Sequence, residues 1–312
     1  MNNLKVLFMG TPDFSVPVLK MLIENCNVIG VVTQPDKPVG RSGKISISPV
    51  KEVALQNNIQ VLQPIKIRKE YEEVLSLNPD IIITCAYGQI VPEEVLNYPK
   101  YGCINVHASL LPKHRGGAPI HRAIIEGDKE SGVTIMHMGI GMDDGDIINT
   151  RVIPIEDNDT AESLFDKLSI LGSELLLDTL PSIIDGSAKR VKQDNALATY
   201  SYNIKPEDEV IDFSKTNKEV YNLIRGLNSW PVAHTYLDGK RVKVWASRIG
   251  SDKTTKPGEI INIYKDGIGV STSNGEVVLT EIQLEGKKKM STEAFLNGLQ
   301  DKKSLIGKML GV

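Results

Sequence analysis

The chain has 312 residues, a mass of 34.3 kDa, 41% hydrophobic and 24% charged residues and a formal net charge of −3, a composition typical of a globular protein with room for two hydrophobic cores. No apolar run approaches the roughly 20 residues that a membrane-spanning helix requires, and the first residues lack the basic flank and long apolar region of a secretion signal. These features predict a cytoplasmic protein with no membrane partner. Cys26, Cys85 and Cys103 have no CxxC spacing, which predicts buried thiols and argues against a disulfide or a zinc site.

The first half alternates between strand and helix patterns. Segments with helical spacing, such as residues 14–24 behind a Thr11 or Asp13 cap, separate short apolar runs. This alternation predicts an α/β fold, in which a doubly wound and mostly parallel sheet of the Rossmann-like type carries helices on both faces. The apolar runs are KVLFMG, NVIGVVT, IQVL, DIIITCAY, CINVHAS and VTIMHM.

Two further elements complete this domain, and a linker follows it. We expect a strand over residues 152–155 and a long helix over residues 160–184, which Gly186 ends. The first domain is therefore assigned to residues 1–189. Residues 190–206 have weak periodicity and mixed polarity, which predicts an interdomain linker.

The second domain, residues 207–312, has the pattern of a small β-barrel. One helix is expected over residues 217–226, and short alternating runs follow it. Asp-Gly and Asn-Gly pairs separate these runs, as hairpin turns do. A five-stranded barrel of the oligonucleotide-binding (OB) type suits the length and spacing, although other small barrels fit as well. The turn pairs are Asp238-Gly239, Asp266-Gly267 and Asn274-Gly275.

Polar side chains gather where strands of the predicted sheet end. Asn105 and His107 are two residues apart, so strand alternation points both toward the crevice beyond the carboxyl edge of the sheet. Asp143 follows a neighbouring strand in the loop GMDDGD, where its carboxylate can meet His107, fix the imidazole and favour its protonated form. An amide, an imidazole and a carboxylate together can move a one-carbon acyl group between amines. We therefore predict that Asn105, His107 and Asp143 are catalytic.

These residues also have structural alternatives. An Asn or His in a strand is usually satisfied by its neighbours, and MDDGD is often only a capped turn. The loop lacks the spacing of a calcium site, and prolines and glycines interrupt any helix that could align His107, His114 and His121 as ligands. The first strand ends in Gly10-Thr11-Pro12 and is not followed by a GxGxxG or P-loop pattern, the signatures of nucleotide-binding folds. We therefore predict no metal and no nucleotide cofactor.

Basic residues form two groups that could meet a polyanion. Prolines and glycines disfavour helix or strand in residues 34–44, which predicts a mobile loop whose cations meet phosphates. Residues 1–189 carry 17 Lys and Arg against 24 Asp and Glu, whereas residues 207–312 carry 16 against 14. For both groups a solvated surface is the alternative. The candidates are Lys37, Arg41 and Lys44 in the loop and Lys240, Arg241, Lys243, Lys287, Lys288 and Lys289 in the second domain.

Several segments carry a resemblance to a known family. They are TQPDKPVGRSGK, AYGQIVP, NVHASLLPKHRGGAPIHRAIIEGD, GMDDGDI and IRGLNSWPVAHTYLDGKRVKVW. They resemble the folate-dependent formyltransferases nearly end to end, and within that family the members that act on methionyl-tRNA. By this resemblance Asn105, His107 and Asp143 match the catalytic residues, and Arg41 matches an arginine that probes the acceptor stem. The residues that it implies for folate binding are Ser109, Leu110, Leu111 and Pro112, with Tyr87, Gly88, Gln89 and Ile90.

The resemblance implies that 10-formyltetrahydrofolate, as cosubstrate, donates its formyl group to the amino group of methionyl initiator tRNA in translation initiation, leaving tetrahydrofolate. It implies a second domain that binds tRNA, and we expect a monomer. The alternatives are a formyltransferase for a small amine, such as glycinamide ribonucleotide or an amino sugar, a formyltetrahydrofolate hydrolase, and a noncatalytic RNA-binding protein. A glycinamide ribonucleotide enzyme would need neither the second domain nor the loop at residues 34–44.

Overall fold

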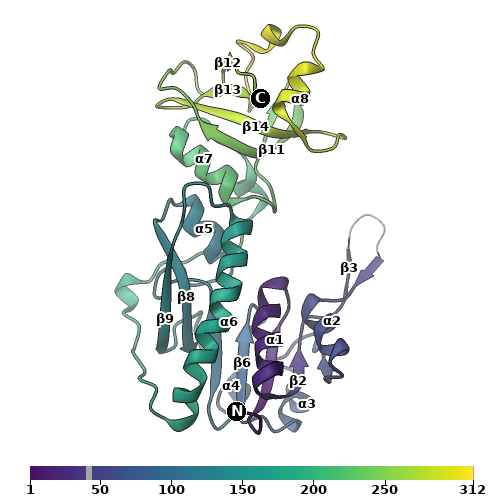
Figure 1. Ribbon diagram of the computed structural model, residues 1–312, viewed down its shortest axis with the longest axis vertical. Coiled ribbons are helices and arrows are strands. Elements are labelled where there is room, and N and C mark those ends of the chain that lie inside the picture. The colour runs from purple at the N-terminus through teal and green to yellow at the C-terminus, as the bar shows by residue number, and fades with distance from the viewer. Residues whose placement is uncertain (40–43, 312) are drawn as a thin grey trace. The chain divides into compact units, whose positions relative to one another are not determined.

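The computed structural model describes residues 1–39 and 44–311, and the chain divides into two compact units (Figure 1). Each unit is assembled from three segments of the chain. The first comprises Met1–Pro119, Glu130–Ile153 and Phe165–Tyr202, and the second comprises Ile120–Lys129, Pro154–Leu164 and Asn203–Val312.

The segment predicted as a linker, residues 190–206, lies mostly in the first unit. Arg115 N donates to Thr199 O at 2.8 Å, and Ala118 N donates to Ser201 O at 3.0 Å. Main-chain hydrogen bonds can hold a segment that has no helical or strand periodicity. Because such bonds leave no pattern of apolar side chains, the sequence of this segment suggested a linker. The first unit therefore extends beyond the predicted boundary at residue 189.

A seven-stranded sheet forms the first unit, in the order β5-β2-β1-β6-β7-β8-β9. The strands from β5 to β7 run parallel, and β8 is antiparallel to β7, which confirms the mostly parallel Rossmann-like sheet. The strand order reverses direction between β1 and β6, and such a reversal opens a crevice at the carboxyl edge. The strands are β1 (Lys5–Gly10), β2 (Asn27–Val32), β5 (Val61–Leu62), β6 (Ile81–Cys85), β7 (Cys103–His107), β8 (Glu130–His137) and β9 (Ile147–Pro154).

Helices cover both faces of this sheet, as predicted. On one face α1 and α6 lie side by side (Figure 1), where the rings of Phe14 and Phe165 meet edge to face with centroids 5.1 Å apart. On the other face, residues of α3 and α4 form a buried core with Leu7 and Met9 of β1. The helices are α1 (Val16–Asn25), α2 (Pro49–Gln56), α3 (Glu72–Ser76), α4 (Glu93–Leu96) and α6 (Ala161–Asp185), whose first turn belongs to the second unit.

Helix ends differ in how well the sequence predicted them. The predicted cap of α1 was wrong, because the 3-10 turn η1 (Asp13–Ser15) precedes the helix and the Thr11 hydroxyl donates to Tyr87 O at 3.0 Å. The end of α6 was right: Gly186 follows it with φ +80°, a left-handed conformation that glycine adopts without strain. No helix in the described parts of the chain is long and apolar enough to cross a membrane.

Antiparallel strands in the order β10-β11-β14-β13-β12 build the second unit, and β15 pairs with β14. Near the C-terminus, Leu310 bridges to Leu237 at the β10 edge, and Met309 bridges to Glu259 beside β12. These bridges join the two edges of a curled sheet, which agrees with the predicted OB-like barrel. The predicted turns connect β10 to β11, β12 to β13 and β13 to β14. The elements are α5 (Pro119–Ile125), η3 (Pro206–Glu209), α7 (Asn217–Gly226), β10 (His234–Leu237), β11 (Lys240–Ile249), β12 (Ile260–Ile263), β13 (Ile268–Ser271), β14 (Glu276–Leu284), β15 (Met290–Ser291), α8 (Thr292–Asn297) and η4 (Lys302–Leu305).

A fully buried carboxylate, Glu276, stabilises this barrel. It accepts hydrogen bonds from Ser251 N at 3.0 Å, from Asn262 Nδ2 at 3.0 Å and from the Tyr264 hydroxyl at 2.8 Å. Burial by itself raises the pKa of Glu276, but these bonds to the charged form outweigh burial and hold the pKa below its usual value.

We expect Glu276→Gln to lower the free energy of unfolding at pH 7 by about 1–3 kcal/mol, because the amide leaves donors in the interior without a charged acceptor. A depressed folded-state pKa contributes stability above the usual carboxyl value, and this contribution disappears as the pH falls through the folded value. The difference in the free energy of unfolding between Glu276→Gln and the wild type should therefore become smaller below about pH 4. Chemical unfolding at several pH values measures these free energies, followed by the fluorescence of Trp230 and Trp245, which both lie in this unit. A difference in unfolding free energy that does not change with pH would contradict a charged Glu276 in this network.

Candidate active site

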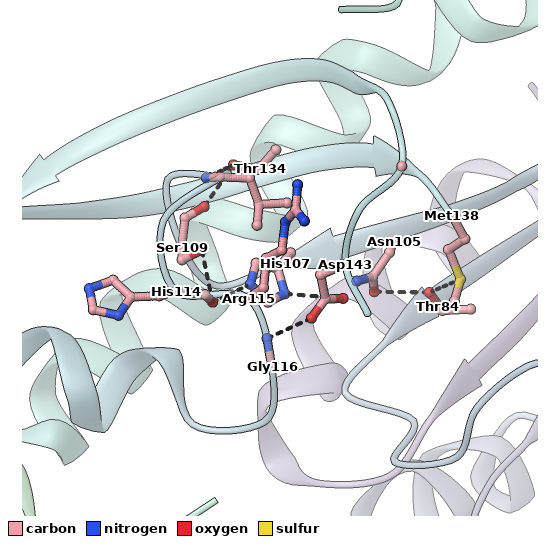
Figure 2. Close-up of polar contacts among 12 residues, drawn as sticks. Thr84, Asn105, His107, Ser109, His114, Arg115, Gly116, Thr134, Met138 and Asp143 are labelled. Carbon is pink, nitrogen blue, oxygen red and sulfur yellow. Dashed lines mark hydrogen bonds and ion pairs between the residues drawn. The ribbon is translucent and has the colours of Figure 1, made fainter. Parts of the chain in front are cut away.

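Three side chains predicted to be catalytic converge beyond the carboxyl edge of the first-unit sheet (Figure 2). Asn105 and His107 lie near the end of β7, and the pleat of the strand directs both to one side. Asp143 lies in the loop between β8 and β9, and its Oδ1 is 3.7 Å from His107 Nδ1. The structure therefore brings together an imidazole and a carboxylate from separate strand ends, beside an amide.

A main-chain carbonyl determines which nitrogen of the His107 ring carries a hydrogen. His107 Nε2 lies 3.0 Å from His114 O, and because a carbonyl only accepts, Nε2 carries a hydrogen. Nδ1 therefore faces Asp143, and it can donate a hydrogen bond only when the ring is an imidazolium. The ring is buried, and because Nε2 is bonded to His114 O, Nδ1 is the ring nitrogen that remains for a reacting group.

Thr84 orients the Asn105 amide. The Thr84 hydroxyl, at the end of β6, donates to Asn105 Oδ1 at 2.9 Å, and Figure 2 shows this contact beside Met138. With its oxygen bound in this way, Asn105 leaves the Nδ2 hydrogens to donate elsewhere. Sequence reasoning did not select Thr84, although its place at the end of the neighbouring strand was a usable signal.

The loop after β7 holds the other oxygen of Asp143. Gly116 N donates to Asp143 Oδ2 at 2.8 Å, while the Asp143 backbone has φ 49°, a left-handed conformation that is uncommon outside glycine. Backbone strain of this kind persists where surrounding contacts hold it. One carboxylate oxygen is therefore anchored, and the other is directed at His107.

Close packing at Gly145 makes the Asp143 loop sensitive to substitution. A Cβ atom at this position would lie 1.9 Å from His137 O and 2.8 Å from Gly139 N, so Gly145→Ala must displace the loop. We expect kcat for the group-transfer reaction to fall by about 10²-fold, as it does for a misplacement of about 1 Å. Steady-state kinetics of Gly145→Ala measure this, with Gly298→Ala as the control because a Cβ there makes ordinary contacts. Wild-type turnover in Gly145→Ala would contradict the assignment of this loop to the site.

The residues predicted to bind folate lie in two loops that are held by hydrogen bonds, one loop by contacts to residues outside it. The Ser109 hydroxyl donates to Lys113 O at 2.6 Å, and Gln89 accepts from Ile67 N at 2.9 Å. Tyr87 O accepts from Gln34 Nε2 at 3.1 Å. These side chains shape the loops. Of the set, Ser109, Leu111 and Tyr87 are buried, Leu110, Pro112 and Gln89 are half-buried, and Gly88 and Ile90 are exposed.

The basic loop predicted at residues 34–44 contains strands. β3 (Lys37–Val39) pairs with β4 (Lys44–Ser46) in a two-stranded antiparallel sheet, so the prediction of a loop without strands was wrong. Pro38 fits because proline is tolerated in an edge strand. Lys37 is exposed. Arg41 lies outside the described residues.

The basic residues predicted in the second unit lie on strand β11 and in the turn between β14 and β15. The Lys289 ammonium lies 4.9 Å from the ring centroid of Trp245 in β11, which brings the turn between β14 and β15 next to the strand that carries the other group. Arg241 is paired with Glu209 at 3.3 Å. The residues that are exposed are Lys240, Lys287, Lys288 and Lys289, whereas Arg241 and Lys243 are half-buried.

The three cysteines are free thiols. Cys85 and Cys103 are buried, as predicted, and burial raises both pKa values, that of Cys85 to about 12. Cys26 is only half-buried. Within residues 1–39 and 44–311, no three His, Cys, Asp or Glu side chains gather in an arrangement that could hold a metal ion.

A Rossmann-like sheet with an amide, an imidazole and a carboxylate at its carboxyl edge, followed by an OB-like barrel, agrees with the two-domain formyltransferases that the sequence segments resemble. Residues 3–180 match the family model for formyl transferase, and residues 203–300 match the model for the formyl transferase C-terminal domain. The chain therefore belongs to the formyl transferase family.

Curated relatives match almost the whole chain. A methionyl-tRNA formyltransferase from Bacillus mycoides (strain KBAB4) is 53% identical over 313 residues, which cover 99% of both chains. One from Bacillus subtilis (strain 168) is 53% identical over 299 residues, or 94% of both chains.

Solved structures share the fold at lower identity. The sugar 3N-formyl transferase WlaRD has a TM-score of 0.68 at 22% identity, covering 92% of this chain and 100% of its own. A methionyl-tRNA formyltransferase from Clostridium thermocellum has a TM-score of 0.56 at 20% identity, covering 79% of this chain and 94% of its own. At these identities the likeness concerns the fold alone.

Proposed function

We propose that this chain transfers the formyl group of 10-formyltetrahydrofolate to the free amino group of methionyl initiator tRNA, for translation initiation. The observation that carries the proposal is the 53% identity, over both units, to proteins named methionyl-tRNA formyltransferase. Placement of Asn105, His107 and Asp143 at one sheet edge supports the chemistry. We expect the enzyme to act in the cytoplasm as a monomer.

The reaction needs donors for a developing oxyanion. The neutral amine attacks the formyl carbon, a carbon–nitrogen bond forms, and the formyl oxygen gains negative charge. The bond from that carbon to the folate nitrogen then breaks, this nitrogen takes a proton, and tetrahydrofolate leaves. We assign the donors to Asn105 Nδ2 and to the His107 imidazolium through Nδ1, each contact typically being worth about 3 kcal/mol of the barrier.

Asp143 has two tasks in this proposal. Its negative charge, 3.7 Å from Nδ1, complements the imidazolium that donates to the formyl oxygen, and it accepts or relays the proton that the attacking amine loses. The Gly116 N–H bond to Oδ2 leaves Oδ1 on the side of the imidazole for both tasks.

We place the folate between the loops of Tyr87–Ile90 and Ser109–Pro112. Main-chain groups and apolar side chains of these loops can hold a flat pterin and exclude water. Two proteins with this fold were solved with folates, WlaRD in the presence of 5-N-formyl-THF and an N-formyltransferase from Helicobacter canadensis with folinic acid. This supports a folate as formyl donor for the chain.

We place the tRNA acceptor stem on the basic hairpin of the first unit and on the exposed lysines of the barrel, where it would meet cations that neutralise phosphates. Arg41→Ala should weaken formyl transfer to initiator tRNA, by about 10-fold or more in kcat/KM if the arginine reads a base or a phosphate. The Kd for folinic acid should stay unchanged. Equal losses in tRNA transfer and folinic acid binding would contradict a role confined to tRNA.

The direct test is formyl transfer from 10-formyltetrahydrofolate to methionylated initiator tRNA, with methionylated elongator tRNA and glycinamide ribonucleotide as competing acceptors. We expect a strong preference for the initiator. Transfer only to a small amine would refute the acceptor while keeping the chemistry. Release of formate without transfer to any acceptor would indicate a hydrolase, and tRNA binding without turnover would indicate a noncatalytic RNA-binding protein.

A further inference from the structure

Gln193 lies in the segment predicted as a linker, but its side chain reaches the loop that carries Asp143. Its Nε2 donates to the main-chain oxygens of Asp143 and Gly145, both at 2.8 Å. Its Oε1 accepts from the Arg115 guanidinium, from Nε at 3.0 Å and from Nη2 at 2.8 Å. One amide thereby joins the loop after β7, the loop after β8 and the segment after α6.

The chemistry of its partners fixes the orientation of this amide. A guanidinium only donates and a main-chain carbonyl only accepts, so Oε1 must face Arg115 and Nε2 must face the loop. The four bonds use both amide hydrogens and both lone pairs of the oxygen. Arg115 is 3% exposed, and hydrogen bonds in such a low-dielectric setting are stronger than in water.

These bonds act on a backbone segment in a strained conformation. Asp143 has φ 49°, and a non-glycine residue keeps such a conformation only while its surroundings hold it. The bond from Gln193 holds the Asp143 carbonyl and so opposes the rotation that would relax φ. That same rotation would swing the carboxylate away from His107 Nδ1.

We propose that Gln193 is a positioning residue for formyl transfer, acting through the main chain of the Asp143 loop without touching substrate. The inference rests on the proposed function for its kinetic consequence. Its structural part, the hold of Gln193 on this loop, can be measured independently of activity.

Gln193→Glu separates positioning from folding. The carboxylate keeps an acceptor for Arg115 and adds an ion pair, which offsets part of the cost of the two lost hydrogen bonds, so the variant should remain folded under assay conditions, with an unfolding midpoint close to that of the wild type. It has no hydrogen to donate to the carbonyls of Asp143 and Gly145. We expect kcat to fall by about 10²-fold with KM for the formyl donor within about twofold of wild type. A stable Gln193→Glu variant with wild-type kcat would overturn the proposal.

A double-mutant cycle with Asp143→Asn tests the route of the effect. If Gln193 acts through Asp143, Gln193→Glu should cost less than about threefold in kcat once Asp143→Asn is present. Losses that multiply in the double mutant would mean that Gln193 acts independently of Asp143, which would overturn the proposal.

Hydrogen exchange of the main chain gives a readout apart from catalysis. Gly116 N donates to Asp143 Oδ2, so its amide should exchange about 10-fold faster in Gln193→Glu, while amides of the central strand β1 keep their protection. Unchanged exchange at Gly116 would show that the loop does not depend on Gln193.

The control is Gln60→Glu, which makes the same amide-to-carboxylate change at an exposed residue and should leave kcat and Gly116 exchange at wild-type values. A wild-type chain that transfers formyl to no acceptor would refute the proposed function, whereas the exchange experiment would still test the hold of Gln193. A loss of kcat in Gln60→Glu equal to that in Gln193→Glu would attribute the loss to charge alone and overturn the positioning role.

Discussion

Asp143→Asn should lower kcat for formyl transfer by about 10³- to 10⁴-fold, the range seen where a carboxylate holds a catalytic imidazole in its working state. The asparagine has the same shape, so it can turn its oxygen to Gly116 N and its amide toward His107 Nδ1. That amide would donate to the Nδ1 lone pair. The ring would then be held neutral, without a hydrogen on Nδ1 for the substrate oxygen, and the acceptor for the amine proton would be lost.

Single-turnover transfer to methionyl initiator tRNA measures this effect without interference from product release. Asp146→Asn is a matched control from the same loop and should keep wild-type turnover, because within residues 1–39 and 44–311 no hydrogen bond joins its side chain to His107 or Asn105. A large loss in Asp146→Asn with normal turnover in Asp143→Asn would move the catalytic carboxylate to Asp146.

Local patterns predicted the elements whose signals are contained within a few residues. The helix expected over residues 217–226 is α7, because Thr216 and Glu219 form a capping box in which Thr216 Oγ1 accepts from Glu219 N and Glu219 accepts from Thr216 N. The first strand and the placement of Asn105 and His107 on one side of β7 likewise follow from local alternation.

Contacts between distant segments could not be predicted in this way. Even between the nearby strands β3 and β4, the hydrogen bonds of antiparallel pairing contribute a gain that single-residue preferences of proline and glycine do not contain. The bridge from Leu310 to Leu237 closes the barrel through residues far apart in the chain.

The support of the site depends on such distant contacts as well. Thr84 reaches Asn105 from the neighbouring strand, and Gln193 reaches the Asp143 loop from a segment without periodicity. A motif can indicate which groups do chemistry. It does not contain the hydrogen bonds that orient them, because those bonds are made by residues outside the motif.

Asn105→Ala should lower kcat by about 10²- to 10³-fold, the cost of removing one donor to an oxyanion. In the proposed mechanism Asn105 donates only as charge develops on the formyl oxygen, so kcat and kcat/KM should fall together while the Kd for folinic acid stays near wild type. Thr84 binds Asn105 Oδ1, so the Nδ2 hydrogens are the donors available to the formyl oxygen. The Asn105→Ala variant removes these donors.

Asn105→Asp separates the donor from the shape of the side chain. It keeps the acceptor for the Thr84 hydroxyl but replaces the donor with an oxygen, and it should lose at least as much rate as Asn105→Ala because a second carboxylate oxygen repels the oxyanion. Asn149→Ala, in β9, removes an amide that binds Thr179 Oγ1 at 3.0 Å and serves as a control for the loss of a structural amide. Wild-type turnover in Asn105→Asp would remove Asn105 from the oxyanion site and leave His107 as its donor, whereas equal losses in Asn105→Ala and Asn149→Ala would mean that the fold and not the transition state had been weakened.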